Sequence, residues 1–180
     1  NSSYPNSIEV NMATGIVGQT NNPNKRDTFT NMENITFVGS FDTLLTGDGN
    51  ANVIIGGSGN DTINGGAGND TIDGGAGNDI IQGGSGDDTY HYTGEDGFDT
   101  ITDTGGTDTI IYKTGYASKA PWKAPYRDGN NLVYVSENGK SGFTVVDHFA
   151  DPNKSIELFH YEDADVVSKY DEILIGTTGD

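Results

Sequence analysis

Apolar residues recur at every ninth position through the middle of the chain. Four consecutive nonapeptides share one phrase, in which six residues rich in glycine, asparagine and aspartate precede three residues with an apolar one at their centre. They are GGSGNDTIN (56–64), GGAGNDTID (65–73), GGAGNDIIQ (74–82) and GGSGDDTYH (83–91). Six turn residues followed by three strand residues predict short β-strands joined by tight turns. The central apolar residues should point inward and stack as a thin ladder, which comprises Ile54, Ile63, Ile72, Ile81, Tyr90, Ile101 and Ile110.

Weaker copies extend this frame in both directions. VGSFDTLLT (38–46) and GDGNANVII (47–55) come before the regular copies, and GEDGFDTIT (94–102) and DTGGTDTII (103–111) follow a two-residue insertion. We therefore assign residues 38–111 to the repeat.

The flanks carry β signals of another kind. Residues 1–37 offer the strand-like runs SIEVNMATGIV and NITFVG, between which TNNPNKRD should form an Asn-rich loop. Residues 128–180 offer NLVYVSE, SGFTVVDHF and SIELFHYED, and Asn138-Gly139 predicts a hairpin turn between the first two. Helix signals are sparse throughout, so the sequence predicts an all-β protein with β capping segments at 1–37 and 128–180.

Composition adds a problem of stability. The formal net charge is −18, only 32% of residues are hydrophobic, and there is no cysteine to form a disulfide. The interval between Arg26 and Lys113 contains 15 acidic residues and no Lys or Arg. Such composition favours disorder unless something outside the chain stabilises the fold. The acidity argues against nucleic-acid binding, and no stretch of about 20 apolar residues predicts a transmembrane segment.

The turn residues suggest what that stabiliser is. Glycines at positions one, two and four of each copy let backbone carbonyls turn towards one point, and the aspartate at position six adds a carboxylate. A site made only of oxygen ligands suits Ca²⁺, whereas Zn²⁺ prefers His and Cys. We expect several Ca²⁺ ions.

These nonapeptides resemble the RTX, or haemolysin-type, calcium-binding repeat G-G-x-G-x-D-x-U-x, in which U is large and apolar. The resemblance implies a right-handed parallel β-roll with ions held between turns two repeats apart. It pairs Asp61 with Asp79, Asp70 with Asp88, Asp79 with Asp99 and Asp88 with Asp108. The carbonyl ligands it implies come from Gly56, Gly57, Gly59, Gly65, Gly66, Gly68, Gly74, Gly75, Gly77, Gly83, Gly84 and Gly86. Asn52 and Thr43 replace the aspartate in the first frames, so sites that rely on them should be weak or empty.

The family likeness also implies a biological setting. RTX proteins are exported unfolded by the type I secretion apparatus of Gram-negative bacteria and fold outside the cell on binding calcium. We expect a segment of a longer secreted protein, whose activity the repeat does not reveal. Motifs of catalytic sites are absent from this sequence, so we expect the segment itself not to be an enzyme.

Residues 112–127, YKTGYASKAPWKAPYR, form a basic and aromatic connection with two open interpretations. It folds back on the acidic roll, or it binds an acidic polysaccharide or a peptide as a module of an RTX adhesin or of a polysaccharide-active enzyme, such as the alginate epimerases, whose similar modules bind their polyanionic substrate. The ligand-binding hypothesis names Lys119, Trp122, Lys123, Tyr126 and Arg127.

Overall fold

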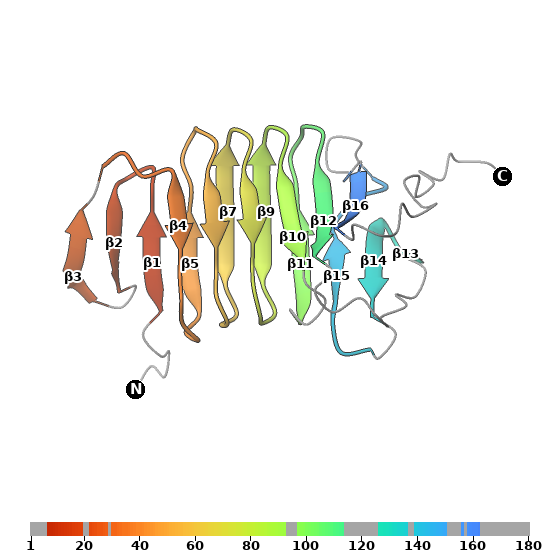
Figure 1. Cartoon of the computed structure of the whole chain (residues 1–180), viewed down its shortest axis with the longest axis horizontal. Coiled ribbons are helices and arrows are strands. Elements are labelled where there is room, and N and C mark those ends of the chain that lie inside the picture. The colour runs from red at the N-terminus through yellow and green to blue at the C-terminus, as the bar shows by residue number, and fades with distance from the viewer. Residues whose placement is uncertain are drawn as a thin grey trace.

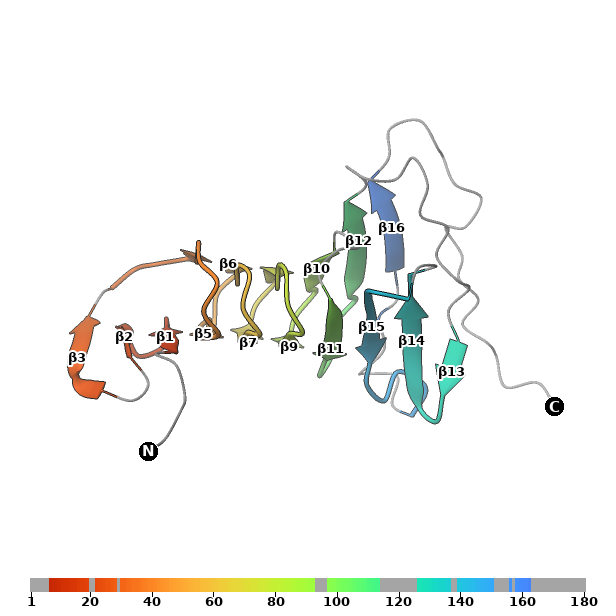
Figure 2. The same cartoon turned by 90° about the horizontal axis from the view of Figure 1, so that it is seen from below.

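A computed structural model describes residues 7–19, 22–28, 30–92, 97–113, 126–136, 139–150, 156 and 158–162, and its strands lie in two facing sheets (Figures 1 and 2). Among these residues there is no helix, and hence none that could cross a membrane. The strands before the regular repeats are β1 (Ile8–Asn11), β2 (Ile16–Gln19), β3 (Asn22–Thr28), β4 (Asn34–Thr36) and β5 (Thr43–Thr46). Those of the repeats are β6 (Val53–Ile55), β7 (Thr62–Ala67), β8 (Thr71–Asp73), β9 (Ile80–Ser85), β10 (Thr89–Tyr92), β11 (Phe98–Thr102) and β12 (Thr109–Lys113). The last four are β13 (Tyr126–Asp128), β14 (Asn131–Val135), β15 (Gly142–Val145) and β16 (Leu158–Glu162).

Successive strands of the repeat alternate between the two sheets. One sheet has ten strands in the order β13-β14-β15-β11-β9-β7-β5-β1-β2-β3, and the other has six in the order β16-β12-β10-β8-β6-β4. Within the repeat all neighbours are parallel, and Ile63 lies beside Ile81, two repeats further along the chain. The predicted all-β parallel β-roll is therefore confirmed.

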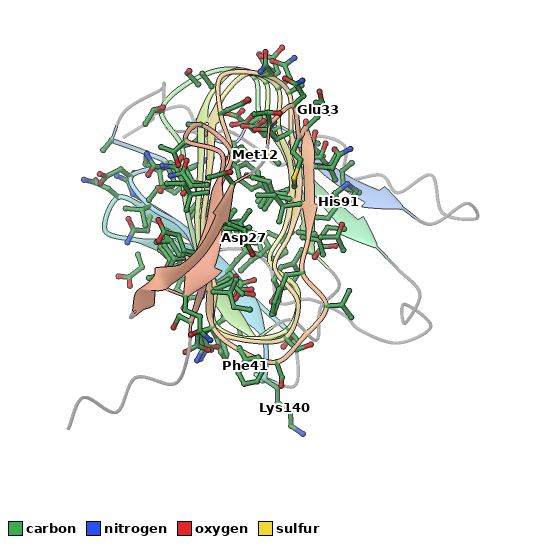
Figure 3. All side chains as sticks on the ribbon, turned by 90° about the vertical axis from the view of Figure 1, so that its left-hand side faces the viewer. Met12, Asp27, Glu33, Phe41, His91 and Lys140 are labelled. Carbon is green, nitrogen blue, oxygen red and sulfur yellow. The ribbon has the colours of Figure 1, made fainter. Side chains whose placement is uncertain are left out.

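The core between the sheets consists of two facing rows of apolar side chains, one row from each sheet (Figure 3). All seven predicted ladder residues are buried, and Ile35 and Leu45 extend the two rows towards the N-terminus. Alternation along a strand decides which other positions share this inner face. In β7 and just before it, Asp61, Ile63 and Gly65 are buried while Thr62 is exposed. Positions six, eight and one of the repeat thus all face inward, which places each aspartate at the edge of the apolar core.

The N-terminal flank continues the larger sheet beyond the repeat. Strand β1 pairs in parallel with β5, and β2 and β3 follow as antiparallel neighbours. The predicted Asn-rich loop is wrong, because residues 22–28 form β3. Pairing with β2 satisfies backbone groups there, and this overrides the weak strand propensity of Asn, Asp and Lys.

The C-terminal flank adds strands to both sheets. Strand β15 pairs in parallel with β11 and antiparallel with β14, which confirms the predicted hairpin, and β16 pairs in parallel with β12. In the hairpin the ring of Tyr134 stacks on Phe143 with centroids 5.2 Å apart, and Tyr92 meets Phe143 edge-on at 5.3 Å. Phe143 lies beside Asp99 in the register of β11 and β15, so these rings cover the end of the aspartate row, while the buried Val145 lies beside Ile101 and continues the ladder.

Candidate calcium sites

The turns of the roll stack along two rims. The first rim comprises turns 47–52, 65–70, 83–88 and 103–108, which lead from the ten-stranded sheet to the six-stranded one. The second rim comprises turns 37–42, 56–61 and 74–79 and the described end, 97–99, of the next connection. Neighbouring turns on one rim are two repeats apart in sequence, so each rim brings equivalent residues side by side.

The position-six aspartates form one chain along each rim. On the first rim the backbone N–H of Asp70 donates to Oδ1 of Asp88 at 2.8 Å, and that of Asp88 donates to Oδ1 of Asp108 at 2.8 Å. On the second rim the N–H of Asp61 donates to Asp79 at 2.7 Å, and that of Asp79 donates to Asp99 at 2.9 Å. The structure therefore brings together the four predicted pairs, and all six carboxylates are buried.

The second carboxylate oxygen of these residues faces the space between turns. Among the described residues, no hydrogen bond reaches Oδ2 of Asp61, Asp70 or Asp88. A Cβ placed on Gly56 would lie 2.5 Å from Oδ2 of Asp61 and 2.5 Å from the carbonyl oxygen of Gly74. Glycine at position one thus makes room for a carboxylate and a carbonyl that converge from adjacent turns. Converging hard oxygens that lack a donor are the ligands that Ca²⁺ takes.

Electrostatics make this arrangement costly without a cation. Burial raises the pKa of Asp61, that of Asp70 to about 6 and that of Asp88 to about 7, because desolvation disfavours the charged form. The neighbouring charges of Asp103, Asp70 and Asp87 raise the pKa of Asp88 further. Since residues 27–112 contain no Lys or Arg, the repeat has no permanently charged cationic side chain to offset these carboxylates.

The remaining glycines let the turns approach each other closely. Gly75 has φ +89° and Gly77 has φ +140°, values that favour glycine. A Cβ on Gly75 would collide with the carbonyl of Gly57 in the preceding turn of the rim, and a Cβ on Gly77 would collide with that of Gly59. The carbonyls predicted as ligands lie in these stacked turns, at Gly56, Gly57, Gly59, Gly65, Gly66, Gly68, Gly74, Gly75, Gly77, Gly83, Gly84 and Gly86.

Position five contributes a hydrogen-bond ladder that the sequence analysis missed. The side-chain oxygen of Asn60 accepts from the N–H of Asn78 at 2.8 Å, and Asn69 accepts from Asp87 at 3.0 Å. Asp87 in turn accepts from the N–H of Thr107 at 2.8 Å. The recurrence of Asn at this position was the available signal, because Asn and Asp commonly bond to backbone groups in turns.

The first turns of each rim depart from the pattern, as the sequence predicts. Both N–H and Oγ1 of Thr43 donate to Oδ1 of Asp61, at 2.7 and 2.8 Å. The N–H of Asn52 donates to Oδ1 of Asp70 at 2.8 Å. Neither residue adds a carboxylate to the space between turns, and weak binding there stays a prediction.

The structure describes only Tyr126 and Arg127 of the five residues in the ligand-binding hypothesis. Lys119, Trp122 and Lys123 lie outside the described residues. Tyr126 is exposed on β13, and the guanidinium of Arg127 lies 4.7 Å from the ring centroid of Phe149, with Nε donating to the carbonyl of Gly129 at 2.7 Å. Arg127 thus contacts groups of its own chain.

A parallel roll with two rims of buried, inward-facing carboxylates defines a calcium-binding β-roll. The sequence model of the RTX calcium-binding nonapeptide repeat matches in four overlapping copies, at residues 39–72, 46–81, 65–92 and 91–116. Residues 39–116 therefore belong to the RTX repeat family, whose repeats are structural calcium-binding modules and not catalytic ones. None of the curated proteins compared with this chain matches it.

Proposed function

We propose that this chain is a calcium-dependent folding module of a larger secreted protein. The proposal depends on one observation above all: Oδ2 of the buried Asp61 and Asp70, which no hydrogen bond from the described residues reaches, faces a carbonyl of the adjacent turn, in a repeat without Lys or Arg. Calcium bound between the turns cancels the repulsion along each rim and ties successive coils together. Its binding free energy then becomes folding free energy.

The proposed ligands are Oδ2 of the paired aspartates and the turn carbonyls that face them. Four aspartate pairs suggest about four well-formed sites, two on each rim. Extracellular calcium modules typically have dissociation constants of about 10⁻⁴–10⁻³ M. A module of this affinity is unfolded in calcium-poor cytosol, which suits export through a type I secretion apparatus, and it folds on reaching calcium outside.

A calcium titration of the purified chain, followed by far-UV circular dichroism and small-angle X-ray scattering, tests this proposal. We expect a cooperative gain of β signal together with compaction at submillimolar to millimolar Ca²⁺, and no such change with Mg²⁺, which demands stricter octahedral geometry. A chain that is fully folded in excess chelator would contradict the proposal.

Binding of an acidic polysaccharide or peptide by the basic and aromatic connection stays a prediction. Tyr126 and Arg127 alone do not define a site, and Arg127 already contacts Phe149.

A further inference from the structure

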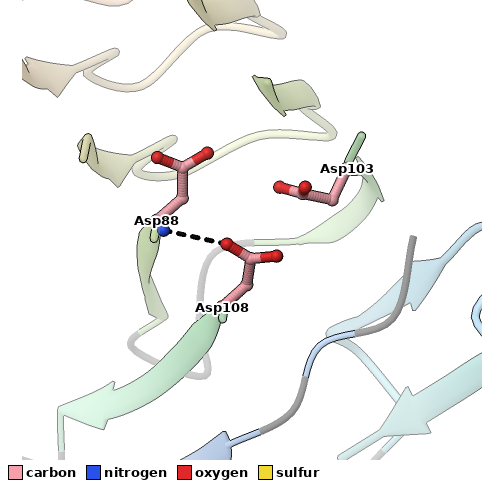
Figure 4. Close-up of side chains that lie close together, drawn as sticks. All are labelled: Asp88, Asp103 and Asp108. Carbon is pink, nitrogen blue, oxygen red and sulfur yellow. Dashed lines mark hydrogen bonds between the residues drawn. The ribbon is translucent and has the colours of Figure 1, made fainter. Parts of the chain in front are cut away.

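The last turn of the first rim differs from the others at position one. In DTGGTD this position is Asp103, where the regular copies have glycine. Position one faces inward, so a side chain there enters the space that glycine leaves open in the other turns. Asp103 is buried, and Figure 4 shows its carboxylate beside those of Asp88 and Asp108. One oxygen from each of the three carboxylates lies within 4.8 Å of the others.

Two hydrogen bonds hold Asp103 in this position. Its Oδ1 accepts from the N–H of Gly105 at 2.8 Å, and its Oδ2 accepts from the hydroxyl of Tyr90. Tyr90 occupies a ladder position that is isoleucine in the neighbouring copies, and its greater length brings the hydroxyl from the core to the rim. A carboxylate offers about four lone-pair sites, so both bonds leave capacity for a cation.

An independent observation is a buried oxygen without a hydrogen-bond donor. Among the described residues no hydrogen bond reaches Oδ2 of Asp88, although Asp88 is only 1% exposed. A Cβ placed on Gly83 would lie 2.5 Å from this oxygen and 2.5 Å from Oδ2 of Asp103. The two oxygens therefore converge on the same point from different turns.

We propose that Asp103 is a third carboxylate ligand, which makes the space between turns 83–88 and 103–108 the tightest cation site of the roll. This inference rests on the proposed function, because it assigns one interturn site a higher affinity than the rest. Calcium affinity rises with the number of charged ligands and with the rigidity of the site. The other sites offer two position-six carboxylates, whereas this one offers three. Tyr90 acts as a positioning residue that fixes the added carboxylate.

The test measures the rate at which calcium leaves the fully loaded chain. When binding is coupled to folding, all sites fill at the same calcium concentration, so an equilibrium titration does not distinguish them, whereas their release rates can differ. The protein is loaded in 10 mM CaCl₂ and mixed in a stopped-flow instrument with excess fluorescent chelator. In the native chain we expect one ion per chain to leave about tenfold more slowly than the others, which corresponds to about 1.4 kcal/mol. In Asp103→Asn and in Asp103→Gly, which restores the residue of the regular copies, the slow phase should merge with the others.

Two further variants separate a ligand from a merely structural residue. Asp87→Asn is the matched control, because it removes one negative charge from the same rim and introduces the residue found at position five of the other three regular copies. It should change the slow phase less than twofold. Tyr90→Phe leaves all three carboxylates in place and should accelerate the slow phase less than Asp103→Asn does.

The outcomes distinguish this inference from the proposed function. An unchanged slow phase in Asp103→Asn, or a full reproduction of its effect by Tyr90→Phe, would show that Asp103 is not a ligand. Failure of both Asp103 variants to fold at 10 mM calcium, monitored by circular dichroism, would also overturn the inference, because the other sites should support folding. Absence of calcium binding in the native chain would instead refute the proposed function.

Discussion

The change Ile72→Ala removes no calcium ligand, yet it should raise the calcium concentration at which the roll folds. Ile72 is fully buried and lies beside Ile54 and Tyr90 on the neighbouring strands. Loss of three carbon groups costs about 2.4 kcal/mol in transfer free energy at about 0.8 kcal/mol each. The cavity adds to this, and measured values for such truncations span about 2–5 kcal/mol. We take about 3.5 kcal/mol, because a core formed by only two rows of side chains has few neighbours that could fill the gap.

Coupling to calcium converts this loss into a shift of the folding midpoint. If about four ions bind on folding, each tenfold rise in free calcium stabilises the fold by about 5.6 kcal/mol, four times the roughly 1.4 kcal/mol for one site. A loss of about 3.5 kcal/mol therefore requires about fourfold more calcium at the midpoint.

Far-UV circular dichroism during a calcium titration measures the midpoint, and urea unfolding at 10 mM calcium measures the loss of stability separately. Val53→Ala is the matched control, because Val53 lies in the same sheet as Ile72 but is 39% exposed. Its midpoint should change less than about 1.3-fold, since exposed substitutions usually stay within about 0.5 kcal/mol. A stability loss in Ile72→Ala without a midpoint shift would refute the coupling of binding to folding.

Two other predictions concern the turns and the buried carboxylates. Gly75→Ala should raise the calcium midpoint of folding more than Ile72→Ala does, because Gly75 has φ +89° and the new Cβ would collide with the backbone carbonyl of Gly57. Gly49→Ala is the control in the same titration, since a Cβ at Gly49 meets nothing within 4 Å. In chelator, the β signal should rise as the pH falls from 8 to 4.5. The folded pKa values of Asp70 and Asp88, about 6 and about 7, lie above the unfolded value of about 3.9, so their stabilising contribution is full below pH 3.9 and is lost as the pH rises through 6 and 7. The calcium midpoint should rise over the same fall in pH, because protons compete for these oxygens, and a midpoint independent of pH would count against the buried carboxylates as ligands.

The local features of the roll were predictable because they depend on alternation within a few residues. The nine-residue phase identified Ile54 through Ile110 as the ladder, and the same phase placed Asp61 and its equivalents at the turns. The resemblance to RTX repeats supplied the pairing of turns two repeats apart. The Asn-rich segment 22–28 was misassigned, because its strand state depends on a partner, β2, that lies outside the segment.

The sequence by itself determined which side chains face inward and which cation their oxygens suit, since strand alternation and ligand chemistry are local properties. The tertiary structure alone decided that Asp103 joins Asp88 and Asp108, and that Tyr90 reaches Asp103 from the core. It also decided that β15 and β16 extend the roll in parallel beyond its last repeat. Apart from Asp103 and Asp108, which share one turn, these contacts join residues 13 or more positions apart. Only the stacking of complete coils, with a two-residue insertion before the last two repeats, brings them together.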